Sequence, residues 1–132
     1  MRDTDLVISG GGIGGAVFAL LLARQGLRVT VLEQAKQFAP IYRGEFLQAR
    51  SLQIFQELGL EEAIDEVTYP VFTSRIRHRD GKLYAKVDYR ELTGPVQQAR
   101  NGHHRAIQQT LLDALAKEPT AEVRMGARVT GL

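Results

Sequence analysis

The glycine run GGGIGG at residues 10–15 constrains the fold of this chain more than any other feature. A short apolar run at residues 5–9 precedes it, a helix-like stretch covers residues 14–24, and a second apolar run occupies residues 28–32. Short apolar runs bounded by glycine are typical of buried strands. The order strand, glycine turn, helix, strand predicts an α/β fold with a Rossmann-like βαβ unit and a parallel sheet.

The spacing G-x-G-x-x-G gives each of its glycines a separate physical reason. Gly10 can take the tight turn that leaves the strand, Gly12 lets the backbone approach a pyrophosphate, and Gly15 lets the helix pack closely on the strand. Ile13 and Gly14 lie at the N-terminus of the expected helix, where unpaired N–H groups and the helix dipole favour anions. We therefore expect the phosphates of a cofactor at these five residues.

An acidic residue at the end of the second strand completes the pattern. Glu33 follows Gly15 by 18 positions, and its carboxylate could accept hydrogen bonds from the hydroxyls of an adenosine ribose. The same charge would repel a 2′-phosphate, so we expect FAD or NAD rather than NADP, with the neighbouring Gln34 beside the ribose. The alternative is a cluster of glycines that only packs a helix, with Glu33 in solvent.

Composition narrows the classes of function. The 132 residues are 44% hydrophobic, enough for one domain with a core, and contain no cysteine. Disulfides, thiolate metal sites and a cysteine nucleophile are thereby excluded, so redox chemistry would need a bound cofactor. A formal charge of +2 gives little support to a nucleic-acid partner. The longest apolar run, residues 16–23, is too short to span a bilayer, and Asp3 and Asp5 do not fit a signal peptide, so we expect a cytoplasmic protein without a membrane partner.

Turn signals and periodicity divide the remaining sequence. The dipeptide Asp80-Gly81 between two strand-like runs predicts an inserted antiparallel β-hairpin. The expected elements, in chain order, are a loop at 34–48, helices at 50–58 and 61–67, strands at 73–78 and 83–88, a loop at 89–102, a helix at 105–117, and strands at 122–125 and 126–132.

The expected strand order exposes one edge of the parallel sheet. If the strand at 122–125 pairs with the second strand, and the second strand with the first, the first strand lies at an edge. Leu6, Val7 and Ile8 make that edge hydrophobic, without the proline or lysine that usually protects one. We therefore expect a homodimer formed through this edge or through residues 128–132.

Three blocks together resemble the N-terminal part of the flavoprotein aromatic hydroxylases, the para-hydroxybenzoate hydroxylase family of class A flavin monooxygenases. The first block is the glycine run with Glu33. The second is RGEFLQARSL at residues 43–52, similar to the family's segment beside the flavin. The third is HRAIQQTLL at residues 104–112, similar to the helix whose first polar residue reaches the FAD phosphate and ribityl region.

The resemblance implies FAD as the cofactor and adds three binding residues. Arg43 and Gln48 would line the loop beside the flavin, and Arg105 would approach the phosphates, with which a guanidinium pairs well. Each arginine has an alternative, since Arg43 could form a surface ion pair with Glu45 and Arg105 could be solvated.

The family's activity is what the resemblance implies for the complete enzyme: hydroxylation of an aromatic or polyketide-like small molecule with NAD(P)H and O2. Its members continue well beyond this length, so residues 1–132 are expected to be a single incomplete, apparently truncated FAD-binding domain, with residues 70–100 beginning a substrate-domain β insertion. No catalytic or metal-binding residue is expected, because the flavin carries the chemistry and the pair His103 and His104 lacks further ligands. Two alternatives stay open: a flavin-dependent reductase or dehydrogenase of an apolar substrate, and a non-catalytic dinucleotide-binding module.

Overall fold

The computed structural model describes residues 3–37 and 43–131, which form two compact units. The first unit combines Met1–Tyr42 with His104–Leu132, and the second is Arg43–His103. Each unit has its own sheet and helices and is described by itself. The segment 70–100, predicted to begin a substrate-domain insertion, lies inside the second unit, and that assignment stays a prediction.

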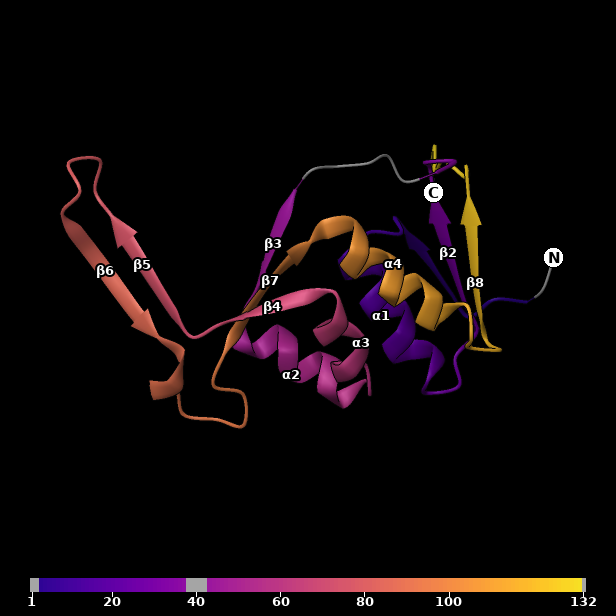
Figure 1. Ribbon diagram of the computed structural model, residues 1–132. Coiled ribbons are helices and arrows are strands. Elements are labelled where there is room, and N and C mark those ends of the chain that lie inside the picture. The colour runs from indigo at the N-terminus through magenta and orange to yellow at the C-terminus, as the bar shows by residue number, and fades with distance from the viewer. Residues whose placement is uncertain (1–2, 38–42, 132) are drawn as a thin grey trace. The chain divides into compact units, whose positions relative to one another are not determined.

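The first unit is built on a parallel sheet in the order β1-β2-β8 (Figure 1). Its strands are β1 (Leu6–Ser9), β2 (Val29–Glu33) and β8 (Ala121–Met125). Ile8 pairs with Val31, and Val31 pairs with Val123, and both pairings are parallel, so all three strands run in the same direction. The predicted strand order is confirmed, and within the described residues β1 is an edge strand.

Two helices lie on one side of this sheet, α1 (Ile13–Ala23) and α4 (His104–Leu115) (Figure 1). The core forms between them and the strands, where Leu20 of α1 and Val31 of β2 are fully buried. The buried residues of α4 are Ile107, Gln108, Leu111, Ala114 and Leu115. Spacings of three and four residues place this stripe on one face of the helix, as the sequence predicts.

The second unit has an antiparallel sheet in the order β3-β7-β4, next to two short helices. The elements are β3 (Gly44–Leu47), α2 (Ala49–Glu57), α3 (Glu61–Glu66), β4 (Thr68–Val71) and β7 (Ala99–His103). Phe55 and Ile64 are buried in its core. The Arg100 side chain, also buried, donates from Nε to Thr68 Oγ1 at 2.7 Å, and its Nε lies 3.1 Å from Asp65 Oδ1. A buried guanidinium is thus paired and hydrogen-bonded, as burial of a charge requires.

The predicted hairpin is present and forms a sheet of its own from β5 (Thr73–Arg77) and β6 (Leu83–Asp88). Gly81 has φ +85°, which the turn requires, and Lys82 N donates to Asp80 Oδ1 at 2.9 Å. A short 3₁₀ helix, η1 (Tyr89–Glu91), follows β6. The Asp-Gly signal therefore located this turn correctly.

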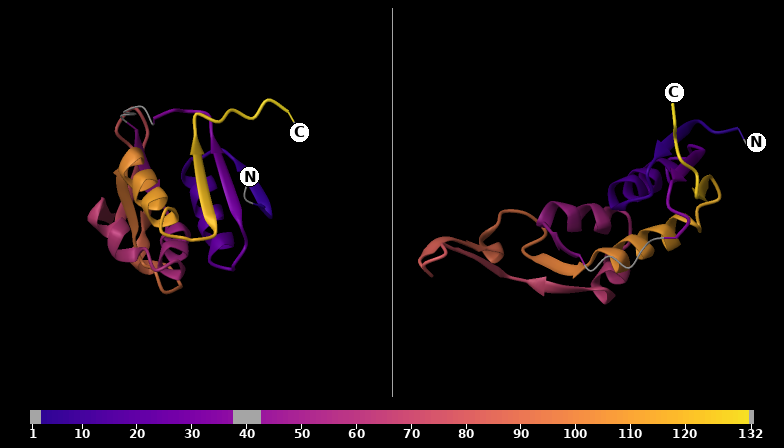
Figure 2. Two further views of the ribbon diagram at one scale, coloured as in Figure 1. Left: turned by 90° about the vertical axis from the view of Figure 1, so that its right-hand side faces the viewer. Right: turned by 90° about the horizontal axis from the view of Figure 1, so that it is seen from above.

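Four details of the predicted elements are wrong. The loop at 34–48 contains β3, the loop at 89–102 contains η1 and most of β7, and β4 was not foreseen. The strand expected at 126–132 does not form: residues 127–131 add no strand to the sheet and extend away from β8 (Figure 2), while Leu132 lies outside the described residues. Gly126, at φ +71°, turns the chain out of the sheet there.

Candidate functional site

The glycine turn between β1 and α1 is tight at two positions that only glycine can occupy. Gly10 has φ +109°, in the region that side chains disfavour. A Cβ placed on Gly15 would lie 2.1 Å from the Gly10 carbonyl oxygen, closer than any two such atoms can come. The predicted reasons for these two glycines, a tight turn and close packing of the helix, agree with this geometry.

Gly12 differs from both of them because its backbone angles suit any residue and it also faces open space. It is the N-cap of α1, with φ −68° and ψ 177°, and a Cβ placed on it would meet no atom within 4 Å. α1 has no side-chain cap and no acidic residue in its first turn. No carboxylate of the helix itself therefore bonds its first N–H groups or balances the positive end of its dipole. An open backbone at a positive helix end fits the pyrophosphate of a dinucleotide.

Glu33 bridges the glycine turn to the end of β2. Its Oε2 accepts a hydrogen bond from Gly11 N at 2.8 Å, and its Oε1 accepts one from Ala35 N at 2.8 Å. A carboxylate has about four acceptor positions, so two remain for ribose hydroxyls. Glu33 is therefore placed beside the turn, as the sequence predicts, and it also fixes the turn's backbone.

Gln108 of α4 is a site residue that the sequence reasoning missed. Its Nε2 donates to the Gly11 carbonyl oxygen at 2.8 Å, and the residue is only 5% exposed. One signal could have found it: Gln108 lies beside Ile107 on the apolar face of an amphipathic helix, where an uncharged polar side chain needs a partner.

A hollow of about 250 Å³ opens at the carboxyl ends of β1 and β2, next to the turn. It is lined by Ser9, Gly10, Leu32, Glu33, Gln34, Ala127, Arg128 and Val129. The last three residues come from the segment after β8, which is held in place because Ala127 N donates to Glu33 O at 2.8 Å. Ligands of open α/β sheets bind at this end of the strands.

The three residues implied by the resemblance alone are not among the residues that line this hollow. Arg105 is exposed on the first turn of α4 and lines a separate hollow with Gln109 and Met125. Arg43 and Gln48 belong to the second unit. Arg43 Nη2 lies 2.9 Å from Glu45 Oε1, which is the surface ion pair held open as its alternative, and Gln48 is the exposed N-cap of α2. Binding of FAD by these three residues stays a prediction.

The two neighbouring histidines belong to different elements. His103 ends β7 and His104 begins α4, and residues 3–37 and 43–131 contain no group of three or more His, Asp or Glu side chains arranged to hold a metal ion. No helix among the same residues is long and apolar enough to cross a membrane.

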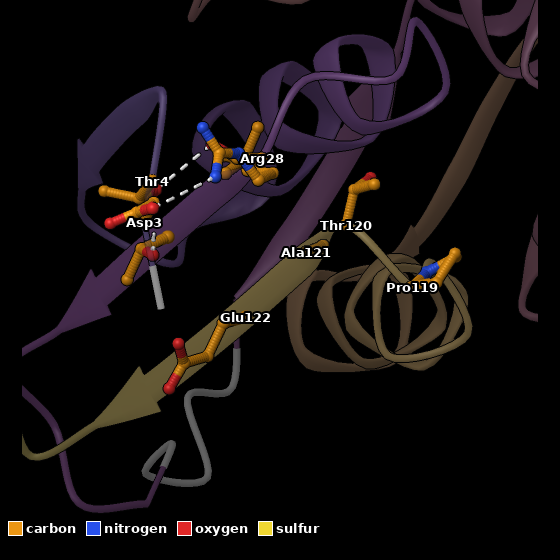
Figure 3. Close-up of a pocket in the computed structure, with 9 residues that line it drawn as sticks. Asp3, Thr4, Arg28, Pro119, Thr120, Ala121 and Glu122 are labelled. Atoms are coloured by element: carbon orange, nitrogen blue, oxygen red, sulfur yellow. Dashed lines mark hydrogen bonds and ion pairs between the residues drawn. The ribbon is translucent and has the colours of Figure 1, made fainter. Parts of the chain in front are cut away.

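A different cavity, of about 180 Å³, lies at the amino ends of the same three strands (Figure 3). Asp3, Thr4, Arg28 and Glu122 are among its lining residues. Next to it, Arg28 Nη2 donates to Asp5 Oδ1 at 2.7 Å and Arg28 N donates to Asp5 Oδ2 at 2.8 Å. These hydrogen bonds from Arg28 lower the pKa of Asp5 from 3.8 to about 2. The charges at this end thus have partners within the chain.

Comparison with known proteins identifies the class. Residues 3–132 match the family described as FAD binding domain. The chain is 32% identical to 6-methylpretetramide 4-monooxygenase of Streptomyces rimosus over 130 residues, covering 98% of this chain and 31% of the relative. It is 33% identical to 3-hydroxybenzoate 6-hydroxylase of Klebsiella oxytoca over 132 residues, covering 96% and 32%.

A solved structure extends the match to the fold. The p-nitrophenol 4-monooxygenase PnpA from Pseudomonas putida DLL-E4 superposes with a TM-score of 0.82 at 26% sequence identity, covering 92% of this chain and 31% of that one. The chain belongs to the FAD-binding domain family, and FAD is the cofactor that its glycine turn and Glu33 fit. The predicted resemblance and fold class are confirmed, and the chain spans about a third of the length of these relatives.

Proposed function

We propose that this chain is the FAD-binding portion of a flavin-dependent monooxygenase that hydroxylates an aromatic or polyketide-like small molecule with NAD(P)H and O2. The observation that carries the proposal is the open backbone at Gly12, at the N-terminus of α1 and directly after Gly11, which bonds the Glu33 carboxylate, in a chain of the FAD-binding domain family. The relatives named above are a monooxygenase and a hydroxylase, which supports the type of reaction.

The residues of the first unit would bind the cofactor without taking part in bond making. The α1 N-terminus and the Gly12 backbone would hold the pyrophosphate, and Glu33 would accept hydrogen bonds from the ribose. Gln34 would contact the ribose, and Arg105 would add positive charge toward the phosphates. FAD, when bound, supplies the redox chemistry, and the protein contributes binding, orientation and exclusion of water.

The second unit offers a surface suited to a flat aromatic molecule. A hollow of about 460 Å³ there is lined by Gly44, Glu45, Phe46, Tyr69, Asn101, Gly102 and His103. Phe46, Asn101 and Tyr69 lie opposite one another in register across the three strands, and Tyr69 is 77% exposed. Two aromatic rings beside an amide provide stacking faces and one polar group that could orient a substrate.

A chimaera tests the proposed function and its alternatives together. The corresponding N-terminal third of 3-hydroxybenzoate 6-hydroxylase would be replaced by this chain, and bound flavin, NAD(P)H oxidation and product would be measured. We expect retained FAD and a hydroxylated product. NAD(P)H oxidation without product would favour a reductase or dehydrogenase, and retained FAD without NAD(P)H oxidation would favour a non-catalytic module.

We also propose a homodimer formed through the β1 edge. Val7 is 54% exposed and Leu6 is 37% exposed, and among the described residues β1 pairs with β2 alone. An exposed hydrophobic edge strand pairs readily with a second chain. Sedimentation at low concentration should therefore show a dimer or larger assembly. A monomer whose Val7 and Ile8 amides are fully protected from exchange would contradict this.

A further inference from the structure

The peptide groups on either side of Gly11 are held from two elements that are far apart in the sequence. Gly11 N donates to Glu33 Oε2 at 2.8 Å, at the end of β2. Gly11 O accepts from Gln108 Nε2 at 2.8 Å, from the middle of α4. The two bonds fix the orientation of the backbone immediately before Gly12, the position whose open side fits the pyrophosphate.

A glycine run needs such bonds because its own sterics restrict it little. Without a Cβ, each glycine samples a wide range of backbone conformations, and ordering that range costs conformational entropy. A site that is ordered before its ligand arrives avoids this cost on binding. Glu33 supplies one constraint and Gln108 the other, so the turn would be only half restrained without α4.

Burial makes the Gln108 bond costly to lose. Gln108 is 5% exposed, and its bond to Gly11 O is itself buried. A buried carbonyl that loses its donor is left without a hydrogen bond, and its desolvation is then uncompensated. A carbonyl at the surface would bond to water instead. The turn would then be expected to rearrange toward solvent rather than keep its geometry with an unpaired oxygen.

We propose that Gln108 is a positioning residue for FAD: its carboxamide holds the Gly11 carbonyl so that the backbone at Gly12 is set for the pyrophosphate before the cofactor arrives. The inference rests on the proposed role of the glycine turn in binding FAD. Gln108 acts through Gly11 and does not itself touch the cofactor.

The test uses ADP as the probe and one matched pair of variants. Gln108→Leu keeps a similar volume but removes the donor, and we expect the dissociation constant for ADP to rise about tenfold. Thr110→Val is the control, since it also removes a side-chain bond to a backbone carbonyl on α4, from Oγ1 to Ala106 O at 3.0 Å, away from the turn. We expect the control to bind ADP as the unchanged chain does.

Hydrogen exchange in the unchanged chain provides a readout that does not depend on a variant folding. The Gln108 carboxamide should exchange far more slowly than that of Gln109, which is exposed and bonded to Asp113 Oδ1 at 2.8 Å. In Gln108→Leu, the Gly11 amide should exchange faster, although its own partner Glu33 is still present.

The outcomes separate this inference from the proposed function. Unchanged ADP affinity in Gln108→Leu, or equal exchange of the two carboxamides in the unchanged chain, would overturn the positioning role alone. Failure of the unchanged chain to bind ADP would overturn both. Weaker binding in Gln108→Leu and not in Thr110→Val, together with faster exchange at Gly11, would support the role.

Discussion

The two ends of the parallel sheet in the first unit carry hollows of opposite character. At the carboxyl ends the hollow lies next to the glycine turn: Gly10 lines it, and the Glu33 carboxylate, which also lines it, bonds to main-chain N–H groups. At the amino ends the cavity borders charged groups that already have partners, since Arg28 donates to Asp5 through three nitrogen atoms, N, Nε and Nη2.

A hollow in the surface is therefore not enough to identify a binding site. Both hollows lie at ends of the same sheet, but only the one next to the glycine turn lies beside exposed backbone at the positive end of a helix, where an anion gains hydrogen bonds. At the other end an anion would have to compete with Asp5 for Arg28. A substitution at one end of the sheet should therefore leave the other end unchanged.

The largest effect is expected from Gly15→Ala. The new Cβ would lie 2.1 Å from the Gly10 carbonyl oxygen, so the turn or α1 must move. We expect a loss of about 3 kcal/mol in the free energy of unfolding, at the upper end of the usual range for overpacking, measured by urea denaturation. Gly14→Ala is the matched control, because its Cβ meets nothing within 4 Å and alanine favours a helix, so it should not destabilise. Equal stability of the two variants would contradict the close approach.

Gly12→Val should separate binding from folding. The added side chain projects into the space where the phosphates must approach, and no protein atom lies within 4 Å of its Cβ. We expect ADP affinity to fall by about tenfold or more while the free energy of unfolding changes by less than about 1 kcal/mol. Denaturation followed by circular dichroism measures the free energy of unfolding, and titration with ADP measures the affinity. Loss of fold together with loss of binding would show that Gly12 is structural.

Glu33→Ala should weaken ADP binding by about 1–3 kcal/mol, the range for a hydrogen bond to a charged group or a buried partner left unpaired. The loss has two sources, since the carboxylate would bond the ribose and already bonds Gly11 N. Isothermal titration with ADP is the measurement. An unchanged affinity would remove Glu33 from the site.

The smallest effect is expected at the amino end, from Asp5→Asn. The folded-state pKa of Asp5 is lowered from 3.8 to about 2 by its bonds with Arg28. Its contribution to stability is therefore fully present above about pH 4 and is lost as the pH falls through about 2. The variant should lose that part of the pH dependence and keep its ADP affinity. A change in ADP affinity at neutral pH would show that the amino end of the sheet affects binding at the carboxyl end.

The sequence predicted the first unit better than the second, for a physical reason. β1, α1 and β2 carry their own signals, since apolar strands flank a glycine turn. β3 and β7 do not: the segments GEFL and ARNGH lack β-branched residues and contain Gly44, Asn101 and Gly102, so pairing across the sheet makes them strands. Pro70 argues against a strand at residues 68–71, so β4 is not predicted from the sequence. β4 accepts the proline because it is an edge strand of its sheet.

The site shows the same division. Gly10, Gly12, Gly15 and Glu33 follow from one local spacing, and the structure brings them together. Gln108 comes from a segment 97 positions away from Gly11, and no local pattern specifies that contact. Arg128 reaches the hollow because the chain after β8 turns out of the sheet at Gly126, where a further strand was expected.

An ADP titration of the chain, followed by amide chemical shifts, shows whether the dinucleotide binds at the glycine turn. If FAD binds through the glycine turn, the largest shifts will fall at Gly11, Gly12 and Ala35, with Arg28 and Thr30 at the amino end unmoved. Shifts that cluster instead at Arg28 and Thr30, or their absence at the turn under saturating ADP, would contradict the account.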